Sequence, residues 1–319
     1  MNEQLREAIA AVLPDVACVI GWGPGSDPLR SAPYFMTTAD DVAQFVAGPL
    51  AVNNTALFLP EYKGRKVGVV VKGCDSRSVV QLLAEKLIRR EDVLIIGYPC
   101  KGVVDGNKIA AKLGEEIEPG MITAAEVTGD TVKLAAKGKV LEMPFVEVRA
   151  AKCATCAYPN AVLHDTFVGE PVPGVEEDVF KDLEEFEKMN VDERMAFWQR
   201  EMSRCIRCYA CRNACPLCVC RDHCVASSRD PHWLTQSDGV RDKFFFQLIH
   251  AMHLAGRCTG CGECGRACPV GIPVDLLKRV MGRAAKHLFG FTGGLDPEAM
   301  PPLQTFKVEE VTIKERDWR

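Results

Sequence analysis

No apolar run in this sequence reaches the roughly 18 residues that a membrane-spanning helix needs. Neither sign of charge is in large excess: 39 basic and 43 acidic residues leave a net charge of −4, which gives no reason to expect nucleic acid or an anionic membrane as a partner. A cleavable secretory signal is also missing, because residues 1–13 carry acidic side chains near their start and have the pattern of an amphipathic helix. We therefore expect a cytoplasmic protein without membrane insertion.

Cysteine, in contrast, is abundant, with 16 residues in 319. Disulfides are typical of small secreted domains, and no export signal supports that use here. Residues 205–216 read CIRCYACRNACP and residues 258–269 read CTGCGECGRACP, so the spacing C-x-x-C-x-x-C-x-x-x-C-P occurs twice. In two-cluster ferredoxins, three cysteines of such a run bind one cluster and the fourth binds the other. Zinc sites usually present two separated cysteine pairs, so a zinc-stabilised interaction protein is the weaker alternative.

The two runs predict two 4Fe–4S clusters with ligands exchanged between the runs. The expected ligands are Cys205, Cys208, Cys211 and Cys268 for cluster 1, and Cys258, Cys261, Cys264 and Cys215 for cluster 2.

The first run is followed directly by three more cysteines: Cys218, Cys220 and Cys224. Their C-x-C-x-x-x-C spacing is not required by either cluster, and three interpretations stay open. They could form an extra metal site, with His223 or His232 as a further ligand, remain free thiols, or replace one of the ligands above. Cys18 lies in a strand-like run and is interpreted as a core residue.

Residues 1–172 are expected to form an α/β or α+β domain with a partly parallel sheet. Short valine-rich runs predict strands at 16–23, 66–73 and 93–100. Residues 75–92 have helical spacing, with Asp75 or Ser76 able to cap the start, so the last two strands and this helix form a right-handed βαβ unit. Residues 130–148 predict a hairpin with a Lys-Gly turn.

Four cysteines of this domain are candidate ligands of a third cluster: Cys74, Cys100, Cys153 and Cys156. Cys74 and Cys100 each follow a predicted parallel strand, so both thiols should emerge at the carboxyl edge of the sheet, where open α/β sheets hold ligands. The C-x-x-C pair at the exit of the domain supplies two more thiols. The alternatives are small buried hydrophobic residues at 74 and 100 and half of a zinc site at 153–156.

The second half of the chain is predicted to be mainly helical. Residues 173–200 are highly charged and indicate a helical linker, and residues 201–290 combine the cysteine runs with helix candidates at 242–256 and 273–288. The first candidate is apolar nearly all round, as a buried helix would be. This layout resembles the α-helical two-cluster ferredoxin domains of heterodisulfide reductase and succinate dehydrogenase iron–sulfur subunits. Residues 291–319 are interpreted as a C-terminal arm for a partner subunit.

Residues 72–100 and 152–170 resemble the β-subunit family of deazaflavin-reducing hydrogenases and formate dehydrogenases, and the resemblance covers roughly residues 15–170. The shared features are the strand end GYPC at 97–100 and the C-x-x-C at 153–156. The resemblance implies an iron–sulfur cluster, FAD, and transfer of electrons between a metal-containing dehydrogenase and a carrier. The sequence does not itself supply a flavin fingerprint: GWGPG at 21–25 lacks the third glycine and the opening helix, and we interpret it as a turn.

No catalytic residues are predicted, because none of the six histidines pairs with a nucleophile in a recognisable motif. We expect an iron–sulfur electron-transfer subunit of an anaerobic oxidoreductase complex. It would relay single electrons between a hydrogenase- or formate-dehydrogenase-like catalytic subunit and a flavin-based, heterodisulfide-reductase-like partner. The alternative is a FAD-containing reductase module for a deazaflavin or nicotinamide carrier.

Overall fold

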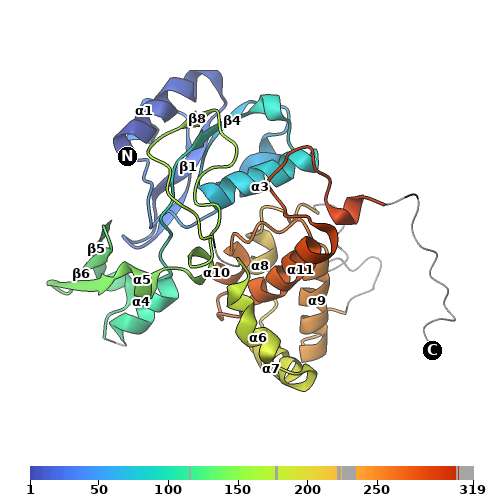
Figure 1. The fold of residues 1–319 in the computed structure, drawn as a ribbon. Helices are drawn as coiled ribbons and strands as arrows, with labels where there is room; N and C mark the ends of the chain where they lie inside the picture. Colours follow the sequence, from blue (N-terminus) through green and yellow to red (C-terminus); the bar gives the residue numbers. More distant parts are fainter. Residues whose placement is uncertain (115, 177–178, 221–223, 225–234, 307, 309–319) are drawn as a thin grey trace.

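The computed structural model describes residues 1–114, 116–176, 179–220, 224, 235–306 and 308 (Figure 1). The strands are β1 (Val19–Pro24), β2 (Ser31–Met36), β3 (Val67–Val71), β4 (Val93–Gly97), β5 (Ile122–Thr128), β6 (Thr131–Ala136), β7 (Lys139–Pro144) and β8 (Thr166–Phe167). The helices are α1 (Asn2–Val12), α2 (Ala39–Ala43), α3 (Gly73–Ala84), α4 (Gly106–Leu113), α5 (Phe145–Val148), α6 (Glu184–Lys188), α7 (Val191–Ser203), α8 (Ala210–Asn213), α9 (Val240–Met252), α10 (Glu263–Arg266) and α11 (Val274–Phe289). Among the described residues, none of these helices has the length and hydropathy to cross a bilayer.

The main sheet has the order β2-β1-β3-β4-β8. β1 pairs antiparallel with β2, whereas the β1–β3, β3–β4 and β4–β8 pairs are parallel. β3, α3 and β4 form the predicted βαβ unit, and the α/β class with a partly parallel sheet is confirmed.

Helices cover both faces of this sheet. Successive residues of a strand point to opposite faces, so Val69 and Val71 of β3 pack against α3 while Val70 packs on the α1 side. The core beneath α3 also contains Cys215, Leu217 and other residues of the ferredoxin region. The two halves of the chain therefore share one hydrophobic core.

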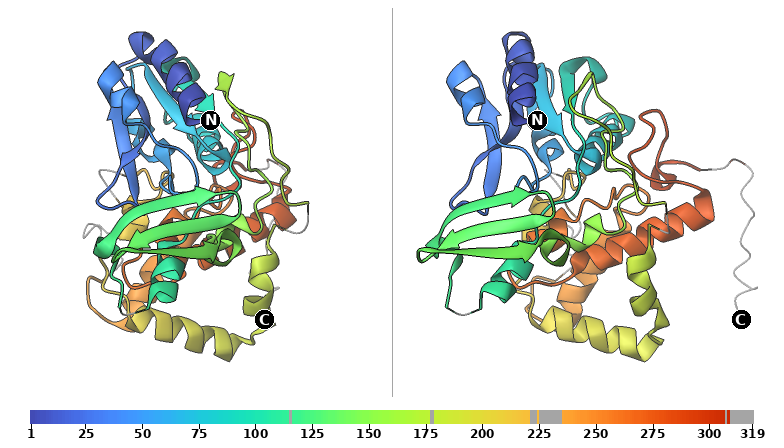
Figure 2. Two further views of the ribbon diagram at one scale, coloured as in Figure 1. Left: turned by 90° about the vertical axis from the view of Figure 1, so that its left-hand side faces the viewer. Right: turned by 60° about the vertical axis from the view of Figure 1, so that its left-hand side comes forward.

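A second, antiparallel sheet of β5, β6 and β7 projects from the side of the molecule (Figure 2). β6 and β7 form the predicted hairpin, in which Lys137 and Gly138 both have positive φ. This sheet encloses its own small core with α4 and α5.

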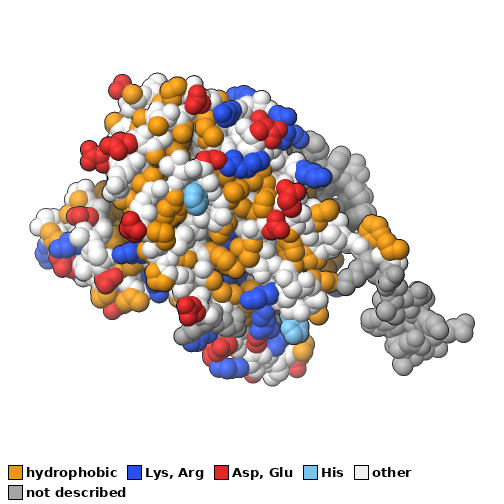
Figure 3. All heavy atoms as spheres, turned by 45° about the horizontal axis from the view of Figure 1, so that its top comes forward, with side chains coloured by type: hydrophobic (Ala, Val, Ile, Leu, Met, Phe, Trp, Pro, Cys, Tyr) orange, Lys and Arg blue, Asp and Glu red, His pale blue; other side chains and the backbone are white. Residues whose placement is uncertain are grey.

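The helical half holds both cysteine runs between α7, α9 and α11, so the helical ferredoxin part of the fold prediction is confirmed. It is joined to the main sheet by several polar contacts with α3. Arg77 donates to the carbonyl oxygens of Thr259 (2.9 Å) and Gly293 (2.6 Å), and Ser78 is hydrogen-bonded to the hydroxyl of Thr259 (3.1 Å). On the face drawn in Figure 3, hydrophobic side chains gather in a patch with charged side chains around it.

Three details differ from the sequence predictions. α3 starts at Gly73 and ends at Ala84, eight residues before the predicted end, because Lys86 adopts a left-handed conformation (φ 56°). Residues 21–24, interpreted as a turn, continue β1 and pair with β2. α9 is not buried all round: Phe245 is 47% exposed, while Phe246 and His250 are buried.

Candidate iron–sulfur centres

The two cysteine runs fold in the same way. In each, a four-residue helix, α8 or α10, starts after a residue in the left-handed conformation, Tyr209 (φ 61°) or Gly262 (φ 68°). A second left-handed residue lies two positions earlier, Arg207 in the first run and Gly260 in the second, and its amide donates to the sulfur of the run's first cysteine at 3.4 Å. The left-handed conformation is energetically unfavourable for residues other than glycine. Because two non-glycine residues of the first run adopt it, we infer that this loop conformation is needed to orient the thiols.

The cluster 1 cysteines, three from the first run and one from the second, line one small cavity. Its other walls are largely apolar and include Phe246, Ile272 and Val274. The amide of Ile272 donates to the sulfur of Cys268 at 3.3 Å. Four thiols around a small, largely apolar space, with amides directed at sulfur, form a donor set that fits a 4Fe–4S cluster.

The cluster 2 cysteines line a second small cavity. Cys215, Cys261 and Cys264 are each at most 9% exposed. Burial raises the pKa of Cys261 to about 11 and that of Cys264 to about 12. Lys152 and Lys278 line the same cavity, and their positive charges oppose this rise. Buried thiols beside two ammonium groups suit a cluster, which binds thiolates and carries negative charge.

The four candidate ligands of the third cluster line a larger cavity, of about 430 Å³, between the sheet and the helical half. Cys74 lies in the first turn of α3, and Cys100 follows β4, the parallel neighbour of β3. The sulfur of Cys153 accepts a hydrogen bond from the amide of Val103 at 3.5 Å. The carboxyl edge of the sheet thus brings these cysteines to one space, and the donor set there fits a cubane.

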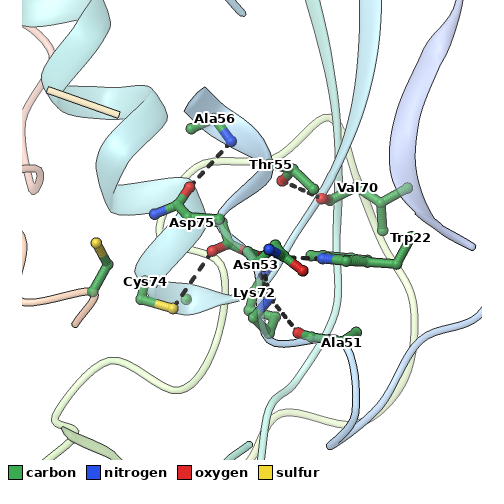
Figure 4. Close-up of polar contacts among 12 residues, drawn as sticks. Trp22, Ala51, Asn53, Thr55, Ala56, Val70, Lys72, Cys74 and Asp75 are labelled. Carbon is green, nitrogen blue, oxygen red and sulfur yellow. Dashed lines mark hydrogen bonds and ion pairs between the residues drawn. The ribbon is translucent and has the colours of Figure 1, made fainter. Parts of the chain in front are cut away.

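A buried ion pair supports the start of α3 next to Cys74 (Figure 4). The ammonium of Lys72 lies 2.9 Å from the carboxylate of Asp75, and both side chains are 1% exposed. Lys72 also donates to the carbonyl oxygen of Ala51 (2.9 Å) and lies 4.0 Å from the ring centre of Trp22. The Asp75 carboxylate accepts a hydrogen bond from the backbone amide of Lys72. Asp75 therefore caps α3 from the third helical position, whereas the sequence predicted it at the start of the helix. This fixed pair holds the loop that presents Cys74.

The second and third cavities are neighbours. Both are lined by Cys258, Lys152 and Lys278. The ammonium of Lys152 donates to the carbonyl oxygen of Cys261, and the thiols around it raise its pKa although burial lowers it. Neither Lys152 nor Lys278 was predicted from the sequence as a site residue. Lys152 had one signal, its position directly before the C-x-x-C, whereas the burial of Lys278 follows only from the packing of α11.

The structure also gives positions for the four cysteines that are not assigned to a cluster. Cys218, Cys220 and Cys224 line another cavity, together with His250. Cys18 is 3% exposed and packs in the main core, as interpreted from the sequence. His223 and His232 lie outside the described residues. Among the residues that are described, no group of three or more His, Cys, Asp or Glu side chains is arranged to hold a metal ion.

Comparison with known protein families shows which type of domain the cysteine runs belong to. Residues 201–272 match the family model of the 4Fe-4S dicluster domain. The chain is therefore an iron–sulfur protein with a dicluster domain, and the prediction of two 4Fe–4S clusters is confirmed.

The chain is similar over most of its length to β subunits of formate dehydrogenases. It is 25% identical over 352 residues to the F420-dependent formate dehydrogenase subunit beta of Methanocaldococcus jannaschii, covering 89% of this chain and 88% of that protein. It is 25% identical over 345 residues, with the same coverage, to the F420-dependent formate dehydrogenase 1 subunit beta of Methanococcus maripaludis. A chain of the F420-reducing [NiFe] hydrogenase complex from Methanosarcina barkeri aligns with a TM-score of 0.41 and 15% identity, covering 63% of this chain and 86% of that one.

Proposed function

We propose that the chain is a three-cluster electron-transfer subunit of a formate-dehydrogenase- or hydrogenase-like complex. The single observation that carries the proposal is that cysteines from three separate parts of the chain line neighbouring cavities, with Cys258 on the wall of both the second and the third. The order of the sites is then third cluster, cluster 2, cluster 1. The similarity to formate dehydrogenase β subunits supports the setting.

Each cluster passes one electron at a time, and the protein sets its potential through burial, charge and hydrogen bonds to sulfur. Here the chain supplies amide donors to Cys205, Cys258 and Cys268 and ammonium groups near cluster 2. We propose that a hydrogenase- or formate-dehydrogenase-like subunit docks near one end of this series and a flavin-based, heterodisulfide-reductase-like partner near the other.

The ligand assignment is tested by iron and acid-labile sulfide per chain in anaerobically prepared full-length protein. The Cys156→Ala variant should contain about four irons fewer than wild type, since one cubane is lost. Cys18→Ala, which changes a core cysteine outside every proposed site, should retain the wild-type iron content. Equal iron in wild type and Cys156→Ala would contradict the third cluster.

The partners are tested separately, by purification of the chain from its native source. Co-purification of a metal-containing dehydrogenase or hydrogenase subunit together with a flavoprotein is expected. Recovery of the chain only as a monomer would count against the relay.

A second candidate function is a FAD-containing reductase module. The observation that favours it is the size and lining of the third cavity, which holds the basic side chains of Arg77 and Arg149 and the rings of Tyr158 and Phe291 beside the cysteines. Cationic and aromatic groups suit a planar ring with an anionic tail, and FAD would supply the step between one-electron and two-electron transfer. About one flavin per chain in the same preparation would favour this candidate; its absence would favour the relay alone.

A further inference from the structure

Three cysteines that no predicted cluster uses surround a cavity of their own. Cys218, Cys220 and Cys224 line a space of about 300 Å³ between the first cysteine run, α9 and the end of α3. Cys224 is buried, Cys218 is partly buried and Cys220 is exposed. The three thiols thus line one cavity but differ in exposure, from the buried Cys224 to the exposed Cys220.

The imidazole of His250 completes the ring of donor groups. Its side chain comes from α9, lines the same cavity and is 3% exposed. Neither ring nitrogen has a hydrogen-bond partner among the described residues. Buried polar groups are nearly always paired, so an imidazole with both nitrogens unpaired points to a group in the cavity that would bind one of them. Burial lowers the pKa of His250 to about 2, which leaves the imidazole in the neutral form that can ligate a metal.

Cationic side chains surround this set. Arg212 donates to the carbonyl oxygen of Cys220 at 2.8 Å, and Arg257 donates to that of Leu217 at 3.0 Å. Both guanidinium groups also line the cavity. Arg257 is paired with Glu85, which lines the same cavity, so it is mainly the charge of Arg212 that would offset the negative charge of three metal-bound thiolates.

We propose that Cys218, Cys220, Cys224 and His250 bind a fourth iron–sulfur cluster of the 4Fe–4S type. Three thiolates and one imidazole are ligands that iron in such clusters accepts. A cubane suits the site better than a single zinc ion, because each ligand binds a different iron and the ligand atoms stand farther apart than around one ion. The cavity of about 300 Å³ has room for a cubane, whereas a single ion would need far less space.

The site lies next to cluster 2 along the chain. Cys215, a ligand of cluster 2, is three residues before Cys218, and its carbonyl oxygen accepts the Cys218 amide at 3.2 Å. The cavity shares Leu217 with the cluster 2 cavity and Phe246 with the cluster 1 cavity, so the fourth cluster would be a neighbour of the two ferredoxin clusters. This placement does not depend on whether the third cluster is present.

The test compares iron, sulfide and zinc per chain in anaerobically prepared full-length wild type and Cys220→Ala. Because Cys220 is exposed, its replacement should leave the fold intact, which circular dichroism checks. We expect Cys220→Ala to contain about four irons and four sulfides fewer than wild type, whereas Cys18→Ala keeps the wild-type content. The difference between the two proteins reports on this site alone, so it remains informative if the third cluster proves absent.

A second variant addresses the imidazole. His250→Cys should retain the iron but change the electron paramagnetic resonance spectrum of one reduced cluster, since a thiolate replaces a nitrogen ligand. Equal iron in wild type and Cys220→Ala would overturn the proposal. One zinc per chain that is lost in Cys220→Ala, with iron unchanged, would overturn it as well.

Discussion

Lys152 is the residue that most directly connects two of the proposed clusters. Its side chain lines both the second and the third cavity and donates to the carbonyl oxygen of Cys261. The pKa of its ammonium is raised by the thiols of Cys74, Cys261 and Cys153 and by Glu263, against the effect of burial. It is therefore a permanent positive charge at neutral pH, placed between two groups that become more negative on reduction.

Replacement of this charge should make both neighbouring clusters harder to reduce. We expect Lys152→Met to lower the midpoint potentials of cluster 2 and of the third cluster by roughly 60 mV each, which corresponds to a tenfold change in a one-electron equilibrium. A redox titration followed by electron paramagnetic resonance measures the shift. Lys188→Met, at an exposed lysine paired with Glu185, is the control and should leave all potentials unchanged. Unaltered potentials in Lys152→Met would show that the ammonium does not act on the clusters.

At the scale of elements, α3 links the sheet to the ferredoxin region. At its C-terminal end, Glu85 accepts a hydrogen bond from Arg257 Nε at 2.7 Å, and the two side chains are only 3% and 14% exposed. At its N-terminal end, the helix presents Cys74 to the third cavity. The helix therefore fixes the distance between the third set of cysteines and the loop that leads into Cys258.

Loss of the Glu85–Arg257 pair should destabilise this junction. Arg257→Met leaves a buried carboxylate without its partner, and we expect the free energy of unfolding to fall by about 3 kcal/mol. Denaturant unfolding of anaerobic protein, monitored by circular dichroism, measures the change. Arg89→Met breaks the more exposed pair with Asp92 and should cost less than about 1 kcal/mol. Similar losses in the two variants would mean that the buried pair does not hold the junction.

Local pattern predicted the elements better than their ends or their environment. The βαβ unit, the hairpin and the helices near the cysteine runs follow from periodicity and turn residues. The end of α3 does not, because residues 85–92 continue a helical pattern and only the left-handed Lys86 interrupts it. The exposed side of α9 was also missed: Phe245 is apolar, and nothing in the sequence distinguishes it from the buried Phe246.

At the scale of the whole molecule, cysteine spacing predicted which thiols group together but not how the groups follow one another. The shared walls of the second and third cavities arise where Lys152 meets α11 and the loop of Cys258, and Lys152 is more than 100 residues from both in the chain. Such long-range packing has no local sequence signature. The position of the C-terminal arm could not be predicted locally either. Its start is held to the fold by a hydrogen bond from the Gly294 amide to Gln81 of α3, whereas Phe306 and Val308 are 82% and 91% exposed. Residues 309–319 of the predicted arm lie outside the described residues.

The order of the sites has a magnetic consequence. If the third cluster borders cluster 2, the two should interact when both are reduced, and the fully reduced protein should show a broadened, spin-coupled resonance spectrum. Cys156→Ala should remove the part of the coupling that involves the third cluster and leave that between clusters 1 and 2, whose ligands alternate between the two runs. Cys18→Ala provides the matched control, because it removes a thiol from the core without touching a proposed site. If Cys156→Ala loses about four irons and one uncoupled signal while the signals of the remaining clusters keep their shape, the third cluster does not border cluster 2 and the proposed order is wrong.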